Sequence, residues 1–218
     1  MARKAKVKIG GLPVDFDGIQ RPEFFFGLVA PIGTDLDHIS SCLSAELEKV
    51  AYRSIEIKVS KLLHEFDAYK DLAKIQKEEE RYSKHMEAGT AVCERFQTGD
   101  ALAQIAVLRI RIERERLLKG SREHGRAYIL NSLKRPDEVE FLRKVYGQAF
   151  ILIGVNSHRD RRIERLLGKI SASENQSNNA NFRSAAEKLV TIDESEDEKA
   201  FGQNVRGTFP KADFFCSR

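Results

Sequence analysis

The fold is decided by residues 24–36, which read Phe24-Phe25-Phe26-Gly27-Leu28-Val29-Ala30-Pro31-Ile32-Gly33-Thr34-Asp35-Leu36. An apolar run enters this stretch, Pro31 and Gly33 turn the chain, and Thr34 or Asp35 can cap the helix that follows. A strand, turn and helix in this order have the shape of a phosphate-binding loop, whose backbone N–H groups surround phosphates. We therefore predict a phosphate-binding turn that involves Gly27, Pro31, Gly33, Thr34 and Asp35.

The turn lacks the lysine with which such loops reach the terminal phosphates of a nucleotide. Asp35 follows Thr34 close to the place where that lysine is needed, and a carboxylate there repels a triphosphate. Efficient phosphoryl transfer is therefore not expected. The turn can still hold a nucleotide with Mg²⁺, or it can serve the fold alone.

Length and composition indicate one large domain, or one domain with a tail. The chain has 218 residues, of which 41% are hydrophobic, and a formal net charge of +4. No apolar run approaches the ~20 residues that a membrane helix needs, and no apolar signal core follows the basic residues 1–6. We therefore expect a cytoplasmic protein without a membrane partner. The modest charge neither demands nor excludes a nucleic-acid partner.

The sequence contains no complete catalytic or metal-binding signature. Cys42, Cys93 and Cys216 are far apart and odd in number, so they form neither a disulfide framework nor a metal-binding pair. His85-Met86-Glu87 matches the H-x-E of zinc deaminases, but the P-C-x-x-C that this chemistry also requires is absent. We therefore assign no catalytic residue and no metal ligand.

Five short apolar runs predict strands, and helical segments separate them. The runs are residues 23–29, 54–59, 126–132, 149–155 and 212–216. Strands that alternate with helices favour βαβ crossovers, so the predicted fold class is α/β with a doubly wound, mostly parallel sheet.

The domain organisation follows from the same pattern. Residues 1–21 are expected to form an N-terminal tail and residues 22–218 one domain. A long helical insertion, about residues 66–119, separates the second and third strands, and Asp100 is a good N-cap for its second helix. The polar, low-complexity residues 171–181 predict a mobile loop.

Two basic clusters are placed to meet phosphate oxygens. Lys134 and Arg135 follow the third strand, at the edge where open α/β sheets bind ligands. Arg162 and Arg165 share one side of an amphipathic helix, and small-molecule kinases hold phosphates with an arginine-bearing lid of this kind. Each cluster also has a plainer interpretation, as a loop that starts a helix and as a charged helix face without a ligand.

Taken in order, several stretches of the chain resemble the N-terminal half of the bacterial deoxycytidylate-deaminase-type anti-phage proteins, from about residue 22 onward. The stretches are residues 26–36, Glu80-Arg81-Tyr82, 85–89, Gly99-Asp100-Ala101-Leu102-Ala103, 126–139, 153–155, 159–166, Gly202-Gln203-Asn204-Val205-Arg206, 208–209 and 212–213. The resemblance implies a P-loop-kinase-like domain. In that family a zinc-dependent deaminase domain follows, converts dCTP or dCMP to the uracil form and starves phage DNA synthesis. The resemblance covers only the first domain, so the deaminase domain and its zinc ligands are expected to be absent.

The resemblance leads to the hypothesis of a nucleotide-binding, regulatory domain that controls the deaminase of an antiviral defence protein. Its expected partners are a (deoxy)nucleotide, the deaminase domain, further copies of the chain and, as an option, a nucleic-acid regulator. Two departures weaken the phosphate loop. Ala30 stands where a second loop glycine is expected, and residues 191–193 carry no cation where kinase-like domains often have one. A deoxynucleoside monophosphate kinase and a non-catalytic oligomerisation scaffold stay open as alternatives.

Overall fold

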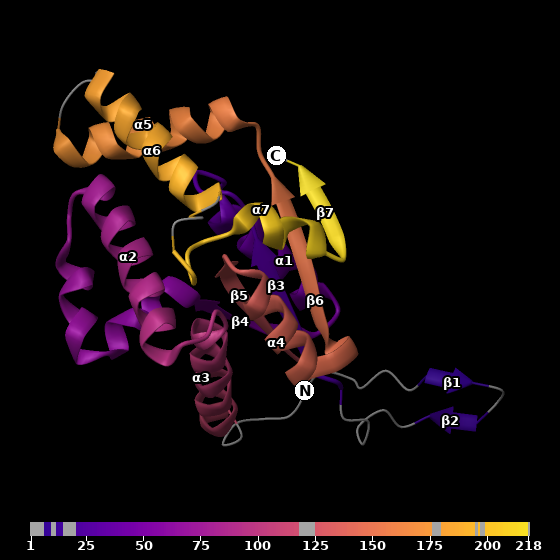
Figure 1. The fold of residues 1–218 in the computed structure, drawn as a ribbon. Coiled ribbons are helices and arrows are strands. Elements are labelled where there is room, and N and C mark those ends of the chain that lie inside the picture. Colours follow the sequence, from indigo (N-terminus) through magenta and orange to yellow (C-terminus); the bar gives the residue numbers. More distant parts are fainter. Residues whose placement is uncertain are drawn as a thin grey trace.

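A five-stranded parallel sheet with the strand order β4-β5-β3-β6-β7 forms the centre of the protein (Figure 1). The computed structural model describes residues 7–9, 12–14, 21–117, 125–175, 180–194, 196 and 199–217. The strands of the sheet are β3 (Phe24–Val29), β4 (Tyr52–Lys58), β5 (Gly125–Leu133), β6 (Phe150–Asn156) and β7 (Phe214–Ser217). Every neighbouring pair is parallel, so the prediction of an α/β fold with a parallel sheet is confirmed.

Helices and 3₁₀ turns make the connections between the strands. Between β3 and β5 these are α1 (Leu36–Lys49), η2 (Val59–Glu65), η3 (Asp67–Lys74), α2 (Glu78–Phe96) and α3 (Ala101–Leu117). After β5 they are α4 (Pro136–Tyr146), η4 (Gly147–Ala149), α5 (Arg159–Glu174), α6 (Ala180–Glu194), α7 (Val205–Thr208) and η5 (Phe209–Lys211).

Helices cover both faces of the sheet because β3 is apolar on both faces. Successive residues of a strand point to opposite faces, and Phe25 and Phe26 accordingly belong to different hydrophobic clusters. Leu43 and Leu47 of α1 pack into the cluster that contains Phe26. One apolar face of α3 and one of α4, the latter with Leu142, pack into the cluster that contains Phe25.

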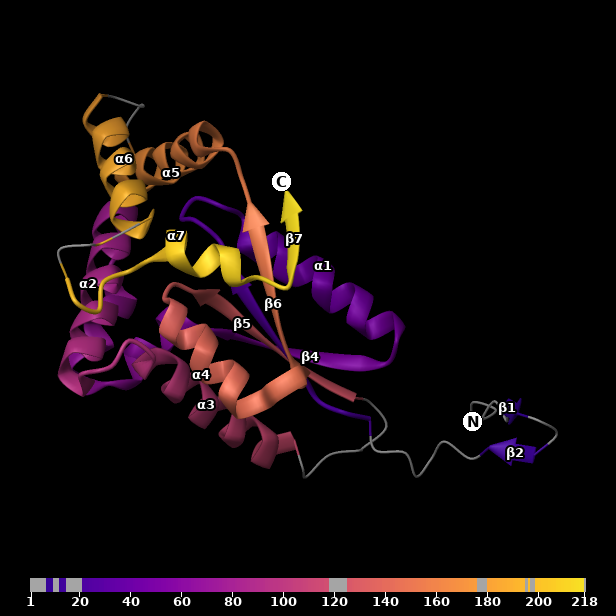
Figure 2. The ribbon, with the colours of Figure 1, turned by 45° about the vertical axis from the view of Figure 1, so that its right-hand side comes forward.

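A third hydrophobic cluster joins α2, α5 and α6. Met86 of α2, Leu166 and Ile170 of α5, and Leu189 of α6 are buried in it. Ile32, from the turn after β3, packs into the same cluster. Figure 2 shows α5 and α6 beyond the arrowhead of β6, so these helices stand at the carboxyl edge, where parallel sheets bind ligands.

The predicted loop at residues 171–181 is shorter than the composition indicates. Residues 171–174 continue α5, Asn175 caps this helix with a positive φ, and residues 180–181 begin α6; residues 176–179 lie outside the described part of the chain. A tertiary contact explains the extra helix, because the Ser173 hydroxyl accepts a hydrogen bond from the Glu78 N–H at the start of α2 (3.0 Å).

Residues 1–21, which the sequence suggests are a tail, contain a second, two-stranded sheet. In it β1 (Val7–Ile9) pairs antiparallel with β2 (Leu12–Val14). Within the described ranges, no helix combines the length and the apolar character that crossing a membrane requires.

Candidate functional site: a cleft at the carboxyl edge of the sheet

The turn after β3 has the geometry that the sequence predicts, with one exception. Gly33 has a φ of 84°, and the Thr34 N–H donates to the Pro31 carbonyl at 3.2 Å. The N-cap of α1 is Asp35, whose carboxylate accepts from the His38 N–H at 3.2 Å. The exception is Gly27. It lies inside β3, where a Cβ atom would meet Leu133 and Phe150 at 2.8 Å, so it is needed for packing and does not contribute to the turn.

A cleft of about 280 Å³ opens beside this turn. One wall is the turn itself, with Pro31, Gly33, Thr34 and Asp35. The other walls come from the ends of β4 and β5, from η2 and α2, and from single residues of α3, α4, α5, α6 and the segment after α6. The cleft therefore lies at the carboxyl edge of the sheet, where open α/β proteins bind their ligands.

Lys134 reaches the turn, as the sequence predicts, but its charge already has a partner. Its Nζ donates to the Ala30 carbonyl at 3.0 Å and lies 2.7 Å from Oδ1 of Asp193. Asp193, near the end of α6, is fully buried, and its Oδ2 accepts a hydrogen bond from the Ile32 N–H at 2.7 Å. A carboxylate from α6 is thus bound to the turn in the manner of a phosphate oxygen.

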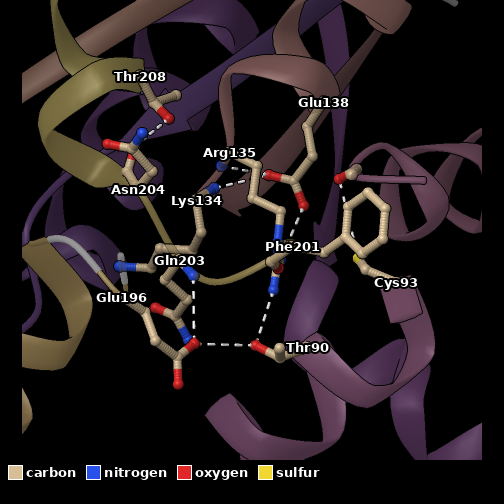
Figure 3. Close-up of polar contacts among 11 residues, drawn as sticks. Thr90, Cys93, Lys134, Arg135, Glu138, Glu196, Phe201, Gln203, Asn204 and Thr208 are labelled. Carbon is tan, nitrogen blue, oxygen red and sulfur yellow. Dashed lines mark hydrogen bonds and ion pairs between the residues drawn. The ribbon is translucent and has the colours of Figure 1, made fainter. Parts of the chain in front are cut away.

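Arg135, which is predicted to contact phosphate, makes contacts within the protein. Only 3% of its surface is exposed. Its Nε donates to the Phe201 carbonyl at 2.8 Å and its Nη2 to the Thr90 hydroxyl at 3.2 Å, and its Nη1 lies 3.6 Å from a carboxylate oxygen of Glu138 (Figure 3). The guanidinium forms part of the cleft wall, but these contacts engage its donors within the protein.

The carboxylate of Glu138 explains why the loop after β5 holds this shape. Its Oε2 accepts from the N–H groups of Lys134 (2.7 Å) and Arg135 (3.0 Å), which caps α4 (Figure 3). Burial raises the pKa of Glu138, and the nearby Arg135 guanidinium opposes that change.

Arg162 and Arg165 support the turn from outside the cleft. Arg162 is buried; its Nη1 donates to the Ile32 carbonyl at 3.4 Å and its Nη2 to Glu194 at 2.8 Å. The Nη1 of Arg165 donates to the Gly33 carbonyl at 3.2 Å. Neither residue is among those found to line the cleft, and their role as phosphate ligands stays a prediction.

Further cations line the cleft, at positions that were not predicted to bind phosphate. Lys58, at the end of β4, donates to Asp37 at 2.6 Å, and this hydrogen bond raises the pKa of Lys58. Arg81 of α2 lies over the Tyr82 ring at 4.4 Å, while Lys169 of α5 is exposed. These residues are far apart in the sequence, and only the folded chain brings them to one cleft.

A histidine pair lies at the α2 wall. Nε2 of His85 is 2.8 Å from Nε2 of His64, and Nδ1 of His85 is 2.7 Å from the Arg81 carbonyl. Because a carbonyl only accepts, Nδ1 of His85 carries its proton and Nε2 accepts from His64. Burial lowers the pKa of both imidazoles, which favours this neutral arrangement.

Four polar atoms of the cleft wall have no hydrogen-bond partner within the described part of the protein. They are Oγ1 of Thr34, Oγ of Ser132, Oε1 of Gln203 and Oδ1 of Asp193, the last of which forms an ion pair with Lys134. Ser132 is the extra residue where the pairing of β5 with β3 shifts register, and such bulges redirect side chains near binding sites. Buried polar atoms are usually satisfied, and a polar molecule in the cleft would satisfy these.

Side chains with oxygen atoms of the kind that Mg²⁺ prefers lie near the turn. Mg²⁺ prefers oxygen ligands and is often bound by one or two carboxylates and by the substrate, and Thr34, Asp35 and Asp37 all line the cleft. No group of three or more His, Cys, Asp or Glu side chains that could hold a metal ion occurs among the residues that the structure describes.

No protein-family model matches the chain, and a search of the curated proteins gives no match. The function of the cleft is therefore inferred from its own residues.

Proposed function

We propose that the cleft binds a (deoxy)nucleotide through its phosphates, and that the chain is the regulatory domain of a deoxycytidylate-deaminase-type antiviral defence protein. One observation carries the proposal: a glycine-containing turn and a lysine meet in a 280 Å³ cleft at the carboxyl edge of a parallel sheet. The link to the deaminase family rests on the sequence resemblance alone.

The charges of the cleft suit a polyphosphate. Lys58, Lys134, Arg81 and Lys169 line the cleft. The first three already form ion pairs, with Asp37, Asp193 and Glu78, and a polyphosphate would compete with these carboxylates. Phosphate oxygens bind ammonium and guanidinium groups and backbone N–H groups. Thr34 adds a hydroxyl for phosphate or for Mg²⁺. We assign no catalytic residue, and zinc would belong to the deaminase domain of the family.

A deoxynucleoside monophosphate kinase is the second candidate. The observation that favours it is Lys134, whose Nζ lies 3.0 Å from the Ala30 carbonyl and so brings to the turn the cation that the turn itself lacks. This candidate requires ADP formation from ATP that depends on a monophosphate acceptor. If the protein binds nucleotides but forms no ADP that depends on a monophosphate acceptor, the regulatory function is favoured over the kinase.

Thermal unfolding against a panel of NTPs, dNTPs and dNMPs, with and without Mg²⁺, tests the proposal. A ligand present at ~100 times its dissociation constant stabilises the folded state by about 2.7 kcal/mol, which gives a clear shift of the midpoint. We expect a selective shift that Lys169→Gln reduces.

The matched control is Lys188→Gln, which removes an exposed lysine of α6 outside the cleft and leaves the shift unchanged. If no nucleotide shifts the midpoint of thermal unfolding, the proposal is overturned. The scaffold alternative then leads, because Phe96, Leu108 and Ile112 are large exposed apolar residues on α2 and α3.

A further inference from the structure

Two donors at the turn, the Ile32 N–H and the Lys134 ammonium, are already engaged by a side chain of the protein. Asp193 has an exposure of 0%, although α6 is a peripheral helix. One carboxylate oxygen accepts from the Ile32 N–H at 2.7 Å, and the other lies 2.7 Å from Nζ of Lys134. The contact joins residues 161 positions apart in the chain.

The two donors are those that a phosphate group requires. A backbone N–H of a glycine-containing turn and a lysine ammonium are the usual ligands of phosphate oxygens. A carboxylate resembles one edge of a phosphate, since it offers two anionic acceptor oxygens at a fixed angle. Both groups cannot use the same donors at once, and two anions in contact repel each other.

We infer that Asp193 is a built-in competitor for the phosphate position of the cleft, and that a phosphate group binds to the Ile32 N–H and the Lys134 ammonium by displacing its carboxylate. This inference rests on the proposed function, because it concerns the same cleft. Oγ1 of Thr34 favours the exchange, since it has no hydrogen-bond partner within the described protein and a phosphate has oxygens to spare for it.

The residues next to Asp193 contact other parts of the molecule, so its displacement can affect them. Asp193 lies in the last turn of α6, beside Glu194, which bonds Arg162. The chain that follows α6 returns to the same lysine, because the Asn204 N–H donates to the Lys134 carbonyl at 2.9 Å. It then continues through α7 to β7. Release of Asp193 therefore removes one of the contacts that hold the end of α6 on the turn.

The test compares Asp193→Asn with the wild-type chain by isothermal titration of inorganic tripolyphosphate and of dCTP. Asn keeps an acceptor for the Ile32 N–H but removes the charge that competes with phosphate. We expect D193N to bind tripolyphosphate at least tenfold more tightly than the wild type. Binding by D193N alone, with none by the wild type, also supports the inference, as a fully occluded site would behave in this way.

The matched control is Glu187→Gln, which removes one negative charge from an exposed position of the same helix and leaves the affinity unchanged. Equal or weaker binding by D193N, when the wild type binds dCTP, overturns the inference and leaves the proposed function standing. Absence of any binding of dCTP, tripolyphosphate and the nucleotide panel by both proteins overturns the two together. An equal gain in E187Q shows a general charge effect and also overturns the inference.

If D193N does not fold, hydrogen exchange of the wild-type chain tests the displacement of Asp193 instead. We expect the amides of residues 190–194 to exchange at least several-fold faster when saturating dCTP is bound, because their anchor on the turn is released. A ligand that binds beside an undisturbed Asp193 leaves these amides unchanged or slower. That result contradicts the displacement while it confirms a nucleotide site.

Discussion

Gly33 gives the turn its close contact with α5. Its φ of 84° lies in the left-handed region, and a Cβ atom would lie 2.6 Å from the Arg162 carbonyl oxygen. The neighbour is backbone, which cannot rotate away as a side chain can. Both the conformation and the space therefore require glycine at this position.

We predict that Gly33→Ala lowers the free energy of unfolding by about 1–3 kcal/mol, because alanine is strained at this φ and clashes with α5. Urea denaturation measures the change. Gly168→Ala is the matched control on α5, since nothing lies within 4 Å of its Cβ and alanine is the better helix former. It raises stability by about 0.5–1 kcal/mol, and an equal loss in both variants contradicts the steric explanation.

Lys134 is the cation on which the buried Asp193 depends. Removal of one partner of a buried ion pair leaves an unpaired charge in the interior. We predict that Lys134→Met lowers the free energy of unfolding by about 3 kcal/mol, whereas Lys169→Met, at an exposed position, changes it little. Addition of Asp193→Asn to Lys134→Met recovers part of this loss. Chemical denaturation of the wild type, the two single variants and the double variant gives the coupling free energy between Lys134 and Asp193.

At the scale of elements, the strands could be predicted from the sequence and the polar loop could not. The interior strands β3, β5 and β6 are short apolar runs because helices cover them on both sides, so their burial can be read from the composition. Ser173 lies in a polar, low-complexity stretch, yet its hydroxyl meets the first turn of α2 and the residues around it are helical. A tertiary hydrogen bond of this kind leaves no periodic signal.

The contact of η2 with α2 contains the histidine pair. The stability of the folded protein should therefore depend on pH. Burial lowers the pKa of His64 and His85 from the ordinary value of 6.5. The folded state then binds fewer protons than the unfolded state, so its stability is complete above about pH 6.5 and falls as the pH drops below that value. We predict that the urea midpoint decreases between pH 7 and 5.

A variant separates this effect from the titration of other groups. His85→Gln, with an amide in place of the imidazole, reduces the decrease of the midpoint over the same pH range. His38→Gln, at an exposed position of α1, preserves the decrease. If H85Q keeps the full decrease, the histidine pair is not its source.

In the whole molecule, some residues of the site could be predicted from the sequence and others could not. The turn and Lys134 could be located because each follows an apolar strand, and parallel strands end at one edge. Asp193 could not be found, since it lies beside a run of acids that resembles a solvated surface and its partners are remote in sequence. The same difficulty affects Arg135 and Arg162, because an arginine in a charged stretch does not reveal whether it is buried.

Because α5 and α6 pack in the third hydrophobic cluster and not in the sheet, we expect their local stability to differ from that of β3 and β5. α5 and α6 pack on each other, on α2 and on the turn, whereas β3 and β5 lie inside the sheet. We predict that native-state hydrogen exchange in low denaturant detects an opening of α5 and α6 with a smaller free energy than the opening of β3 and β5. A single free energy for all four elements would contradict this prediction.

The distance of 161 positions between Ile32 and Asp193 also sets an order of events during synthesis. The ribosome releases the turn long before it has made the carboxylate that binds there. A nascent chain that has formed β3, β4, β5 and β6 therefore presents the Ile32 N–H and Lys134 without their internal partner. The turn can therefore acquire its internal carboxylate only after α6 has been synthesised.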